Sequence, residues 1–533
     1  MVQGSLVQAL RAALGVVGVD APATIELARP QHATHGDWSS NVALVCAKPA
    51  GRNPRDLAAD LVRQITADPP THVERVEVAG PGFVNFFLAD SWLHDVLAAT
   101  VAAGTADFGR HDFGDGTTVN IEFVSANPTG PVHAGHARGA AFGDAVARLM
   151  ARCGYSVSRE FYINDRGNQM DLFAASMAAR AAGEDPPEDG YRGDYVTRWA
   201  ADMPADADVR DWSRERALQD QTEALAAMGV RYDRWFSEMS LVDAGAIERT
   251  LADLRERGVV YDSEGAVWLR STDFGDDKDR VLVRSNGEVT YLLPDVAYHR
   301  DKLARADLLI DVWGADHHGY VPRMRAAIEA LGEDPARLEV LITQLVSLER
   351  DGVEVKIGKR SGELIELADV LDELGADATR FTYLLQSIDT RQTVDLALAA
   401  SRSMDNPVYY VQYAHTRICS LGRELAERGM TRRPLAEADL AVLVHDRELE
   451  LLRLLHGFDD VVSLSCRERA PHKVTTWLRE LAGAFHGFYH DCPILRTDVD
   501  ENVRQARLWL AEATRVGLVS GLELLGVSAP ETM

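Results

Sequence analysis

Two histidines separated by two residues are the most chemically informative feature of this chain. His133 and His136 stand on either side of Ala134 and Gly135, directly after a rigid Pro-Thr-Gly-Pro turn at 128–131. Imidazole N–H groups donate hydrogen bonds, and a glycine lets the backbone approach a ligand closely. At the start of a helix, where unpaired N–H groups and a partial positive charge gather, this combination suits a phosphate. The same spacing is also compatible with a capping interaction or with half of a metal site.

The hydrophobic pattern predicts the elements that position these histidines. Val119, Ile121 and Phe123 alternate with polar residues, which is the period of a β-strand. The alanine-rich run at 134–152, closed by Gly154, predicts a helix. Strand, tight loop and helix therefore follow in sequence, and they place both histidines at a helix N-terminus beside the carboxyl end of a strand.

This order of elements resembles the HIGH signature of class I aminoacyl-tRNA synthetases. The flanking segment Glu-Phe-Val-Ser-Ala-Asn-Pro-Thr-Gly-Pro at 122–131 is similar to that of the arginyl enzymes. The resemblance implies that the loop and the helix start bind ATP and that both histidines act on its phosphates. The implied ATP-binding residues of this first motif are Pro128, Gly130, His133, Gly135 and His136.

A second motif falls at 356–362, where the sequence reads Lys-Ile-Gly-Lys-Arg-Ser-Gly. Lysine is scarce in this chain, which uses arginine for most basic positions, yet two lysines lie in this loop. The loop resembles the KMSKS loop of the class, with Ile357 and Gly358 in place of Met and Ser. Family members without the second lysine resemble one another in carrying a lysine just before the HIGH motif; this chain has Gly130 there and retains Lys359. The resemblance implies catalytic roles for His133, His136, Lys356 and Lys359, the lysines acting on the leaving pyrophosphate, and ATP binding by Lys356, Gly358, Lys359 and Arg360.

A third segment concerns the amino acid. A guanidinium has five N–H donors in a rigid fork and requires carboxylates that face it. The segment Thr-Tyr-Leu-Leu-Pro-Asp-Val-Ala-Tyr at 290–298 resembles the family segment in which a tyrosine and an aspartate hold the arginine side chain. From the residues alone, Tyr291 and Asp295 are also compatible with an ordinary helix start beside a packed aromatic. The resemblance makes Asp295 the predicted specificity residue, and a site that pairs every donor needs no editing domain. The implied arginine-binding residues are Glu122, Asn127, Tyr291 and Asp295, completed by Asp316 or His317.

The net charge of −26 is unexpected for a protein that binds nucleic acid, since phosphate contacts favour basic faces. Net charge is an average, however, and the local field at the contact surface decides binding. Acidic residues cluster at 183–190, whereas several arginines lie close together at 417–433. Those arginines fit RNA binding as well as a solvated helix surface, and we expect any RNA complex to be strongly salt-sensitive.

The cysteines and the N-terminus indicate the compartment. The five cysteines are scattered, with no Cys-x-x-Cys pair, which indicates a reducing compartment and argues against a structural zinc. The N-terminus lacks the basic start and long apolar run of a secretory signal, and no stretch is long enough to span a membrane. We therefore expect a cytoplasmic protein with no metal site of its own.

The expected fold class is a multidomain α/β protein in three parts. Residues 1–116 read as a small α/β unit. Residues 117–392 alternate buried strands with helices, which predicts a doubly wound parallel sheet with ligands at the carboxyl ends of its strands. A mainly helical insertion is expected within this part at about 167–279. Residues 393–533 are helical almost throughout and predict an all-α bundle.

The resemblance extends to all three parts. It implies an N-terminal domain that contacts the tRNA elbow at the D-loop, a catalytic domain whose insertion holds the acceptor end, and a C-terminal anticodon-binding bundle. Phe83 and Asn85 match positions where a ring and an amide meet an exposed base, although they also fit a core residue and a turn residue. Thr532 stands where the family commonly has Arg, which places one anticodon-side contact in question. The implied tRNA-binding residues are Phe83, Asn85, Tyr409, Tyr413 and Arg417; the helical spacing of the two tyrosines fits a core position as well as a base platform.

The implied activity is that of an arginine–tRNA ligase. ATP activates L-arginine to arginyl-adenylate, and the arginyl group passes to the 3′-terminal adenosine of tRNA(Arg), with release of AMP and pyrophosphate. Mg²⁺ is expected on ATP, with no tightly bound cofactor, and the family implies a monomer. Another HxGH-type nucleotidyltransferase would not need the long helical C-terminal part, and a non-catalytic tRNA-binding relative would have lost the histidines or lysines. A metal hydrolase built on His133, His136 and His317 would need a shared open coordination site.

Overall fold

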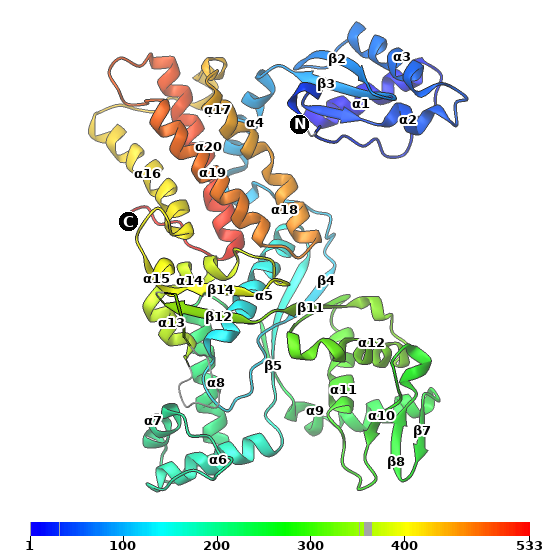
Figure 1. Ribbon diagram of the computed structural model, residues 1–533, viewed down its shortest axis with the longest axis vertical. Helices are drawn as coiled ribbons and strands as arrows, with labels where there is room; N and C mark the ends of the chain where they lie inside the picture. The colour runs from blue at the N-terminus through cyan, green and yellow to red at the C-terminus, as the bar shows by residue number, and fades with distance from the viewer. Residues whose placement is uncertain (1, 31, 351, 356–364) are drawn as a thin grey trace. The chain divides into compact units, whose positions relative to one another are not determined.

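The computed structural model describes residues 2–30, 32–350, 352–355 and 365–533. Their contacts divide the chain into two compact units, whose elements are labelled in Figure 1. The first unit comprises Met1–Phe108, Ser420–Gly457 and Gly483–Gly517, and the second comprises Gly109–Cys419, Phe458–Ala482 and Leu518–Met533. The three-domain division expected from the sequence stays a prediction.

The N-terminal part of the first unit is a small α/β fold, as expected. Its antiparallel sheet has the order β1-β3-β2. The strands are β1 (Trp38–Ser40), β2 (Val73–Ala79) and β3 (Phe83–Leu88), and the helices are α1 (Val2–Val16), α2 (Val42–Ala47), α3 (Pro54–Ala67) and α4 (Ser91–Asp107).

Helix α3 shows how the sequence specifies these elements. The Asn53 side chain accepts hydrogen bonds from the backbone N–H groups of Arg55 and Asp56, and Pro54 occupies the first turn. Leu57 and Leu61, four residues apart, are fully buried beneath the helix.

A five-stranded parallel sheet is the centre of the second unit, which confirms the predicted doubly wound fold. Its order is β11-β10-β4-β5-β6. The chain builds outward from β4 through β5 to β6 on one side, and from β10 to β11 on the other. In such sheets ligands bind at the carboxyl ends of the strands where the direction reverses, here between β4 and β10. The strands are β4 (Thr118–Glu122), β5 (Ser156–Ile163), β6 (Arg234–Ser237), β10 (Leu308–Gly314) and β11 (Leu338–Thr343).

Helix α5 (Ala134–Arg152) follows β4 and has the bounds expected from its alanine-rich sequence. Most of its residues are buried, and small side chains let it pack closely. A Cβ atom at Gly143 would lie 2.3 Å from the ring of Phe123, so only glycine fits there without displacement. The helix is therefore fixed against the segment that follows β4.

The stretch 167–279 contains more strand than the helical insertion expected there. Helices α6 (Asn168–Ala181), α7 (Asp194–Asp202) and α8 (Val209–Ala227) come first, but β6 then joins the central sheet. A four-residue strand is too short to show a clear hydrophobic period, which is why the sequence did not reveal it. After α9 (Met239–Asp243) and α10 (Ala246–Glu256), a small antiparallel sheet forms from β7 (Val260–Ser263), β8 (Ala266–Leu269) and β9 (Arg280–Val283).

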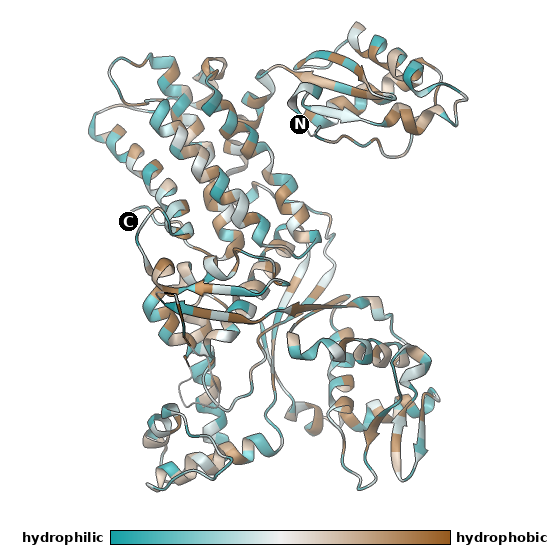
Figure 2. Ribbon diagram, in the orientation of Figure 1, coloured by the Kyte–Doolittle hydropathy of each residue, from teal (hydrophilic) through white to brown (hydrophobic). Residues whose placement is uncertain are grey.

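The remaining elements complete the two units, and the C-terminal part is helical as predicted. A second small sheet has the order β13-β12-β14. In many helices hydrophobic and hydrophilic residues are interleaved along the chain (Figure 2), as expected for helices with one apolar face. Within the described parts of the chain, no helix combines the length and apolar character needed to cross a membrane. These elements are α11 (Leu292–Leu303), α12 (Val321–Ala330), β12 (Val346–Arg350), β13 (Val353–Val355), α13 (Leu367–Leu374), α14 (Ala376–Tyr383), β14 (Gln392–Asp395), α15 (Leu396–Ala400), α16 (Pro407–Glu427), α17 (Asp446–His456), α18 (Phe458–Arg467), α19 (His472–Asp491) and α20 (Glu501–Leu525).

Candidate active site

The two histidines of the first motif form the N-terminal cap of α5. His133 is the N-cap residue, and its Nδ1 accepts a hydrogen bond from the backbone N–H of Gly135 at 3.1 Å. The Nδ1 of His136 accepts from the backbone N–H of His133 at 3.4 Å, and the two rings stack with centroids 3.7 Å apart. Because both Nδ1 atoms accept, the proton of each neutral ring sits on Nε2. The sequence left capping open as an alternative to phosphate binding. In the structure the capping hydrogen bonds leave the proton of each ring on Nε2, and that N–H can donate to a phosphate.

The loop before α5 is held by the segment expected to be an insertion. Tyr195 on α7 donates its hydroxyl hydrogen bond to the carbonyl of Thr129 at 2.9 Å. The Nε2 of Gln221 on α8 donates to the carbonyls of Asn127 and Gly130, at 3.0 and 2.8 Å. A Cβ at Gly130 would come within 3.0 Å of the Tyr195 ring, so this position also needs glycine or a shift of the ring. These contacts fix the path of the backbone into α5.

The second motif lies outside the described residues, because Lys356, Gly358, Lys359 and Arg360 all fall within 356–364. The segment that follows it is described and lies against the first motif. The backbone N–H of Ala134 donates to the carbonyl of Ile365 at 2.9 Å, and that of Leu367 donates to the carbonyl of Val132 at 2.7 Å. The segment that begins at Ile365 is therefore tied to the start of α5.

Asp295, the predicted specificity residue, lies in the first turn of α11. It accepts a hydrogen bond from the hydroxyl of Tyr320 at 2.6 Å. Burial, together with the negative charges of Glu238 and Glu122, raises the pKa of Asp295 to about 6, against the lowering effects of Tyr320 and His299. A partly buried carboxylate under the influence of two other acidic groups creates a local preference for a cation.

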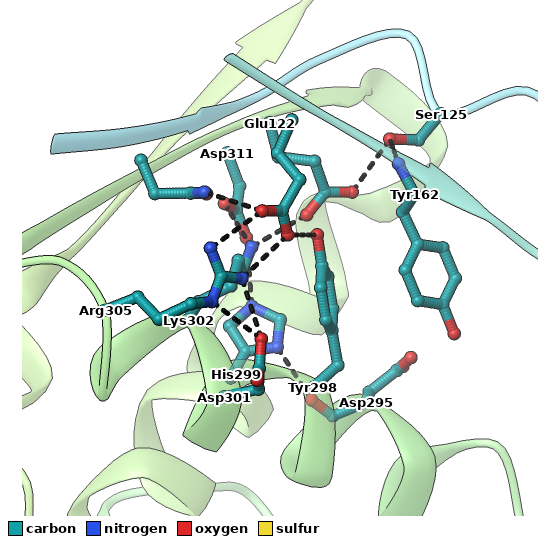
Figure 3. Close-up of polar contacts among 12 residues, drawn as sticks. Glu122, Ser125, Tyr162, Asp295, Tyr298, His299, Asp301, Lys302, Arg305 and Asp311 are labelled. Atoms are coloured by element: carbon teal, nitrogen blue, oxygen red, sulfur yellow. Dashed lines mark hydrogen bonds and ion pairs between the residues drawn. The ribbon is translucent and has the colours of Figure 1, made fainter. Parts of the chain in front are cut away.

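Glu122 ends β4 and is almost fully buried, with 8% of its surface exposed. Its Oε1 accepts from the hydroxyl of Ser125 at 2.9 Å, and its Oε2 accepts from Lys302 Nζ at 2.7 Å (Figure 3). Ser125 and its neighbour Val124 have φ values of 44° and 71°. Positive φ is strained for a β-branched valine, and such strain concentrates at functional sites. The tight turn lets Ser125 reach back to the carboxylate.

Glu238, on the loop after β6, is an acidic group of this site that the sequence did not reveal. It pairs with Arg166 at 3.1 Å. Burial raises its pKa, against the effect of Arg166 and a hydrogen bond from Tyr162. The pKa of Tyr162 is raised by its own burial and by the negative charges of Glu238, Asp295 and Glu122, so the charges of all three carboxylates act on its hydroxyl. Three acidic groups gathered in one place are suited to an extended cation such as a guanidinium.

The other predicted arginine-binding residues are more exposed to solvent than Glu122. Asn127 is partly buried and donates to the side-chain oxygen of Gln169 at 2.6 Å. Tyr291 is 83% exposed at the start of α11. Asp316 and His317 are exposed on the 3₁₀ turn Ala315–Tyr320, directly after β10. The tyrosine whose hydroxyl contacts the Asp295 carboxylate is Tyr320 rather than Tyr291.

The predicted tRNA-binding residues fall in both units. In the first unit, Phe83 is 36% exposed, whereas Asn85 is buried in the middle of β3 and accepts from the Ser39 hydroxyl at 2.7 Å. The reading of Phe83 as core and Asn85 as a turn residue is therefore wrong. In the second unit, the half-buried rings of Tyr409 and Tyr413 stack 5.9 Å apart, and Arg417 donates to the Tyr413 hydroxyl at 3.2 Å.

Sequence reasoning missed several residues that shape this site, for a common reason. Tyr195 and Gln221 act from helices far along the chain, and only the tertiary fold brings them to the 127–130 loop. Of the residues missed, Lys302 alone carried a sequence signal, because lysine is scarce in this chain. Among the described residues, no group of three His, Cys, Asp or Glu side chains is arranged to hold a metal ion. The missed residues are Tyr162, Tyr195, Gln221, Glu238, Lys302 and Tyr320.

Comparisons with known proteins agree with this fold. Residues 2–88 match the arginyl tRNA synthetase N terminal domain, residues 103–186 and 212–396 match the catalytic domain of class I tRNA synthetases (R), and residues 411–533 match the DALR anticodon binding domain. The arginine–tRNA ligase of Listeria monocytogenes serotype 4a (strain HCC23) is 46% identical, over 99% of this chain and 97% of the relative. A putative arginyl-tRNA synthetase structure from Campylobacter jejuni is 33% identical with a TM-score of 0.77, covering 84% of this chain and 100% of that one. The Thermus thermophilus arginyl-tRNA synthetase, at 24% identity, shares the fold over 100% of both chains with a TM-score of 0.76. This chain therefore belongs to the arginyl-tRNA synthetase family.

Proposed function

We propose that this chain is an arginine–tRNA ligase that works through the residues described above. The observation that carries the proposal is that Glu122 ends the strand that leads into the histidine-capped helix α5, and that the charges of Glu122, Asp295 and Glu238 all act on Tyr162. A site for a cationic side chain thus lies on the same strand and loop as a site for phosphates. Family membership supports the same reaction.

In the first step, a carboxylate oxygen of arginine attacks the α-phosphorus of ATP. A new P–O bond forms, the bond from the α-phosphorus to the bridging oxygen breaks, and pyrophosphate leaves. Asp295, Glu122 and Asn127 hold the amino acid, with Tyr291 and either Asp316 or His317 at the exposed rim. His133 and His136 donate from Nε2 to the phosphates, and Lys356 and Lys359 neutralise the leaving pyrophosphate. Catalysis here is positioning and charge stabilisation, with no protein nucleophile.

The nucleotide is held by Pro128, Gly130, Gly135, Gly358 and Arg360 in addition to the catalytic side chains. Gly135 leaves space beside the imidazole, since a Cβ there would lie 2.9 Å from the His133 ring. A hydroxyl of the 3′-terminal adenosine of tRNA(Arg) then attacks the carbonyl carbon of arginyl-adenylate, and AMP leaves. Phe83 and Asn85 in one unit, and Tyr409, Tyr413 and Arg417 in the other, are the proposed tRNA contacts.

Magnesium is proposed to reach the site on ATP. Bound there, it would neutralise charge on the phosphate oxygens. The nucleotide oxygens are its proposed main partners. We also propose that the chain acts in the cytoplasm, where aminoacyl-tRNA is used for translation, and that it acts as a monomer.

Arginine-dependent exchange of pyrophosphate into ATP, measured with and without tRNA(Arg), tests this function. Family resemblance leads us to expect exchange with arginine only when tRNA is present. Charging of tRNA with labelled arginine should follow the same dependence. Exchange that depends on another amino acid, or no exchange under either condition, would overturn the proposal. The lysine roles have their own test: K359M should slow adenylate formation far more than it weakens arginine binding.

A further inference from the structure

Lys302 is a fully buried lysine that the proposed reaction does not use. It lies on α11, seven residues after Asp295, and its surface is 0% exposed. Its Nζ donates to Glu122 Oε2 and to Asp311 Oδ1, both at 2.7 Å, and lies 4.6 Å from the ring centroid of Tyr298 (Figure 3). Burial alone would lower the pKa of Lys302, but Asp311 and Glu122 raise it to about 12. A permanent cation is therefore held against a carboxylate of the proposed arginine site.

The second partner of Lys302 connects it to the backbone of Asp295. Asp311 Oδ2 lies 2.9 Å from His299 Nε2, and His299 Nδ1 lies 2.8 Å from the carbonyl oxygen of Asp295. Burial alone would raise the pKa of Asp311, but Lys302 and His299 lower it to about 2, so it stays ionised. Glu122 on β4 and Asp295 on α11 are thus joined by one continuous chain of buried contacts.

Both oxygens of Glu122 are held from the protein side. Lys302 binds Oε2, while the Ser125 hydroxyl donates to Oε1 and itself accepts from the backbone N–H of Tyr162 at 3.1 Å. A carboxylate fixed at both oxygens has lost its rotational freedom before any ligand arrives, and a group so prepared binds its ligand without that entropy cost.

We propose that Lys302 is a positioning residue for the amino acid: acting through Glu122, it fixes the orientation of that carboxylate for arginine and holds it in register with the helix that carries Asp295. The inference rests on the proposed function. Lys302 does not touch the substrate in this scheme, and its effect is transmitted by the ion pair with Glu122.

A neighbouring ion pair, formed just after the end of α11, separates positioning from simple stabilisation. Arg305, three residues after Lys302, pairs with Glu160 at 2.9 Å and with Asp301 at 2.7 Å. Glu160 is fully buried and also accepts from the Tyr298 hydroxyl at 2.8 Å. Arg305→Met therefore removes a cation from a buried carboxylate near Lys302, but that carboxylate is Glu160 on β5 rather than Glu122. It is the matched control.

The experiment measures tRNA-dependent pyrophosphate exchange and the midpoint of thermal unfolding for the full chain and four variants: K302M, R305M, D311N and K302M/D311N. We expect K302M to raise the KM for arginine roughly 10- to 100-fold while leaving the KM for ATP near its wild-type value, because only the amino acid site is disturbed. R305M should lower the unfolding midpoint but keep the arginine KM. D311N should lower the unfolding midpoint and raise the arginine KM less than K302M does, because it breaks the link to His299 but leaves the ion pair of Lys302 with Glu122. The double variant removes one charge of each sign, so its unfolding midpoint should be higher than that of K302M. Its arginine KM should nevertheless remain raised.

Each result either supports the inference or contradicts it. If K302M/D311N restores the arginine KM, Lys302 only balances the charge of Asp311 and the proposal is wrong. It is also wrong if R305M raises the arginine KM as much as K302M does, or if the ATP and arginine KM values rise together. Should K302M not fold, the double variant and R305M provide the same comparison. A wild-type chain without arginine-dependent exchange would instead remove the proposed function, which is a separate outcome.

Discussion

Asp295 must satisfy two opposing requirements. It has to be ionised to pair with a guanidinium, yet burial and the charges of Glu238 and Glu122 make ionisation unfavourable and raise its pKa to about 6. In the absence of substrate, the ionised form is a local cost to the fold. An arginine side chain removes that cost by supplying the missing positive charge. Ionised Asp295 thus lowers the stability of the free protein and raises its affinity for arginine.

Asp295→Asn should separate these two effects. Near neutral pH the substitution removes a buried charge and keeps the shape, so the unfolding midpoint should stay the same or rise by a few degrees. The arginine KM should rise about 100-fold or more, because the guanidinium loses its ionised partner. Asp301→Asn is the matched control, since it removes the same charge further along α11 from a residue that pairs with Arg305. A fall in unfolding midpoint together with an unchanged arginine KM would contradict this account.

The raised pKa of Asp295 also predicts a pH dependence. The free enzyme holds Asp295 ionised only above about pH 6, so kcat/KM for arginine should fall about tenfold per pH unit below that value. Folding stability should change in the opposite direction. Because the pKa of Asp295 in the folded state exceeds the ordinary 3.8, the fold should lose stability as pH rises from about 4 toward 6. Exchange kinetics and thermal unfolding across this range measure both. In the Asn variant, the acidic limb attributed to Asp295 should disappear from both profiles.

At the scale of residues, the sequence predicted the side chains that carry a recognisable pattern. His133, His136 and Asp295 stand in motifs, and the structure places them at helix starts as expected. Gln221 and Lys302 could not be found this way, because their roles depend on which carbonyl or carboxylate the tertiary fold brings to them. A buried polar side chain has no periodic signature in sequence, so its partner is known only from the fold.

Helix α5 links the histidine cap to the central sheet, and its glycines differ in what surrounds them. A Cβ at Gly143 would lie 2.3 Å from the ring of Phe123, whereas one at Gly139 would meet nothing within 4 Å. Both positions are helical and buried. Glycine lowers helix stability by about 1 kcal/mol relative to alanine, so the two sites should respond to the same substitution with opposite signs.

Gly139→Ala and Gly143→Ala form a matched pair that tests this packing. Gly139→Ala should raise the free energy of unfolding by roughly 0.5–1 kcal/mol through helix propensity. Gly143→Ala should lower it by about 1–3 kcal/mol, because Phe123 must move from a close-packed position. Urea denaturation of both variants measures the difference. Equal effects of the two substitutions would mean that α5 does not pack on Phe123 as described.

At the scale of elements, long periodic segments were predicted and short ones were not. The bounds of α5 matched the alanine-rich pattern, and the alternation of Val119, Ile121 and Phe123 predicted strand β4. Strand β6 was missed because four residues cannot show an alternation, and its position in the sheet depends on pairing with β5. The order β11-β10-β4-β5-β6 is set by such pairings between distant segments.

At the scale of the whole molecule, the charge of −26 has to be reconciled with an RNA substrate. The arginine cluster expected at 417–433 is largely engaged within the protein. In the first unit, Arg428 pairs with Glu424, Arg432 with Glu512 and Arg433 with Glu501. Exposed pairs of this kind are weak and are screened by salt, so an RNA phosphate competes with them for the same cations.

The affinity for tRNA(Arg) should therefore depend steeply on ionic strength, while the affinity for arginine should not. Each phosphate neutralised contributes roughly −0.7 to −0.9 to the slope of log K against log salt, so several contacts predict a loss of orders of magnitude between about 50 and 200 mM salt. Arginine pairs with buried carboxylates at Asp295 and Glu122, where salt screens little, so its KM at saturating tRNA is the internal control. Filter binding of labelled tRNA and exchange kinetics at matched salt concentrations measure the two quantities. A tRNA affinity that is flat in salt would show that shape and base contacts, rather than phosphate contacts, hold the RNA on this acidic protein.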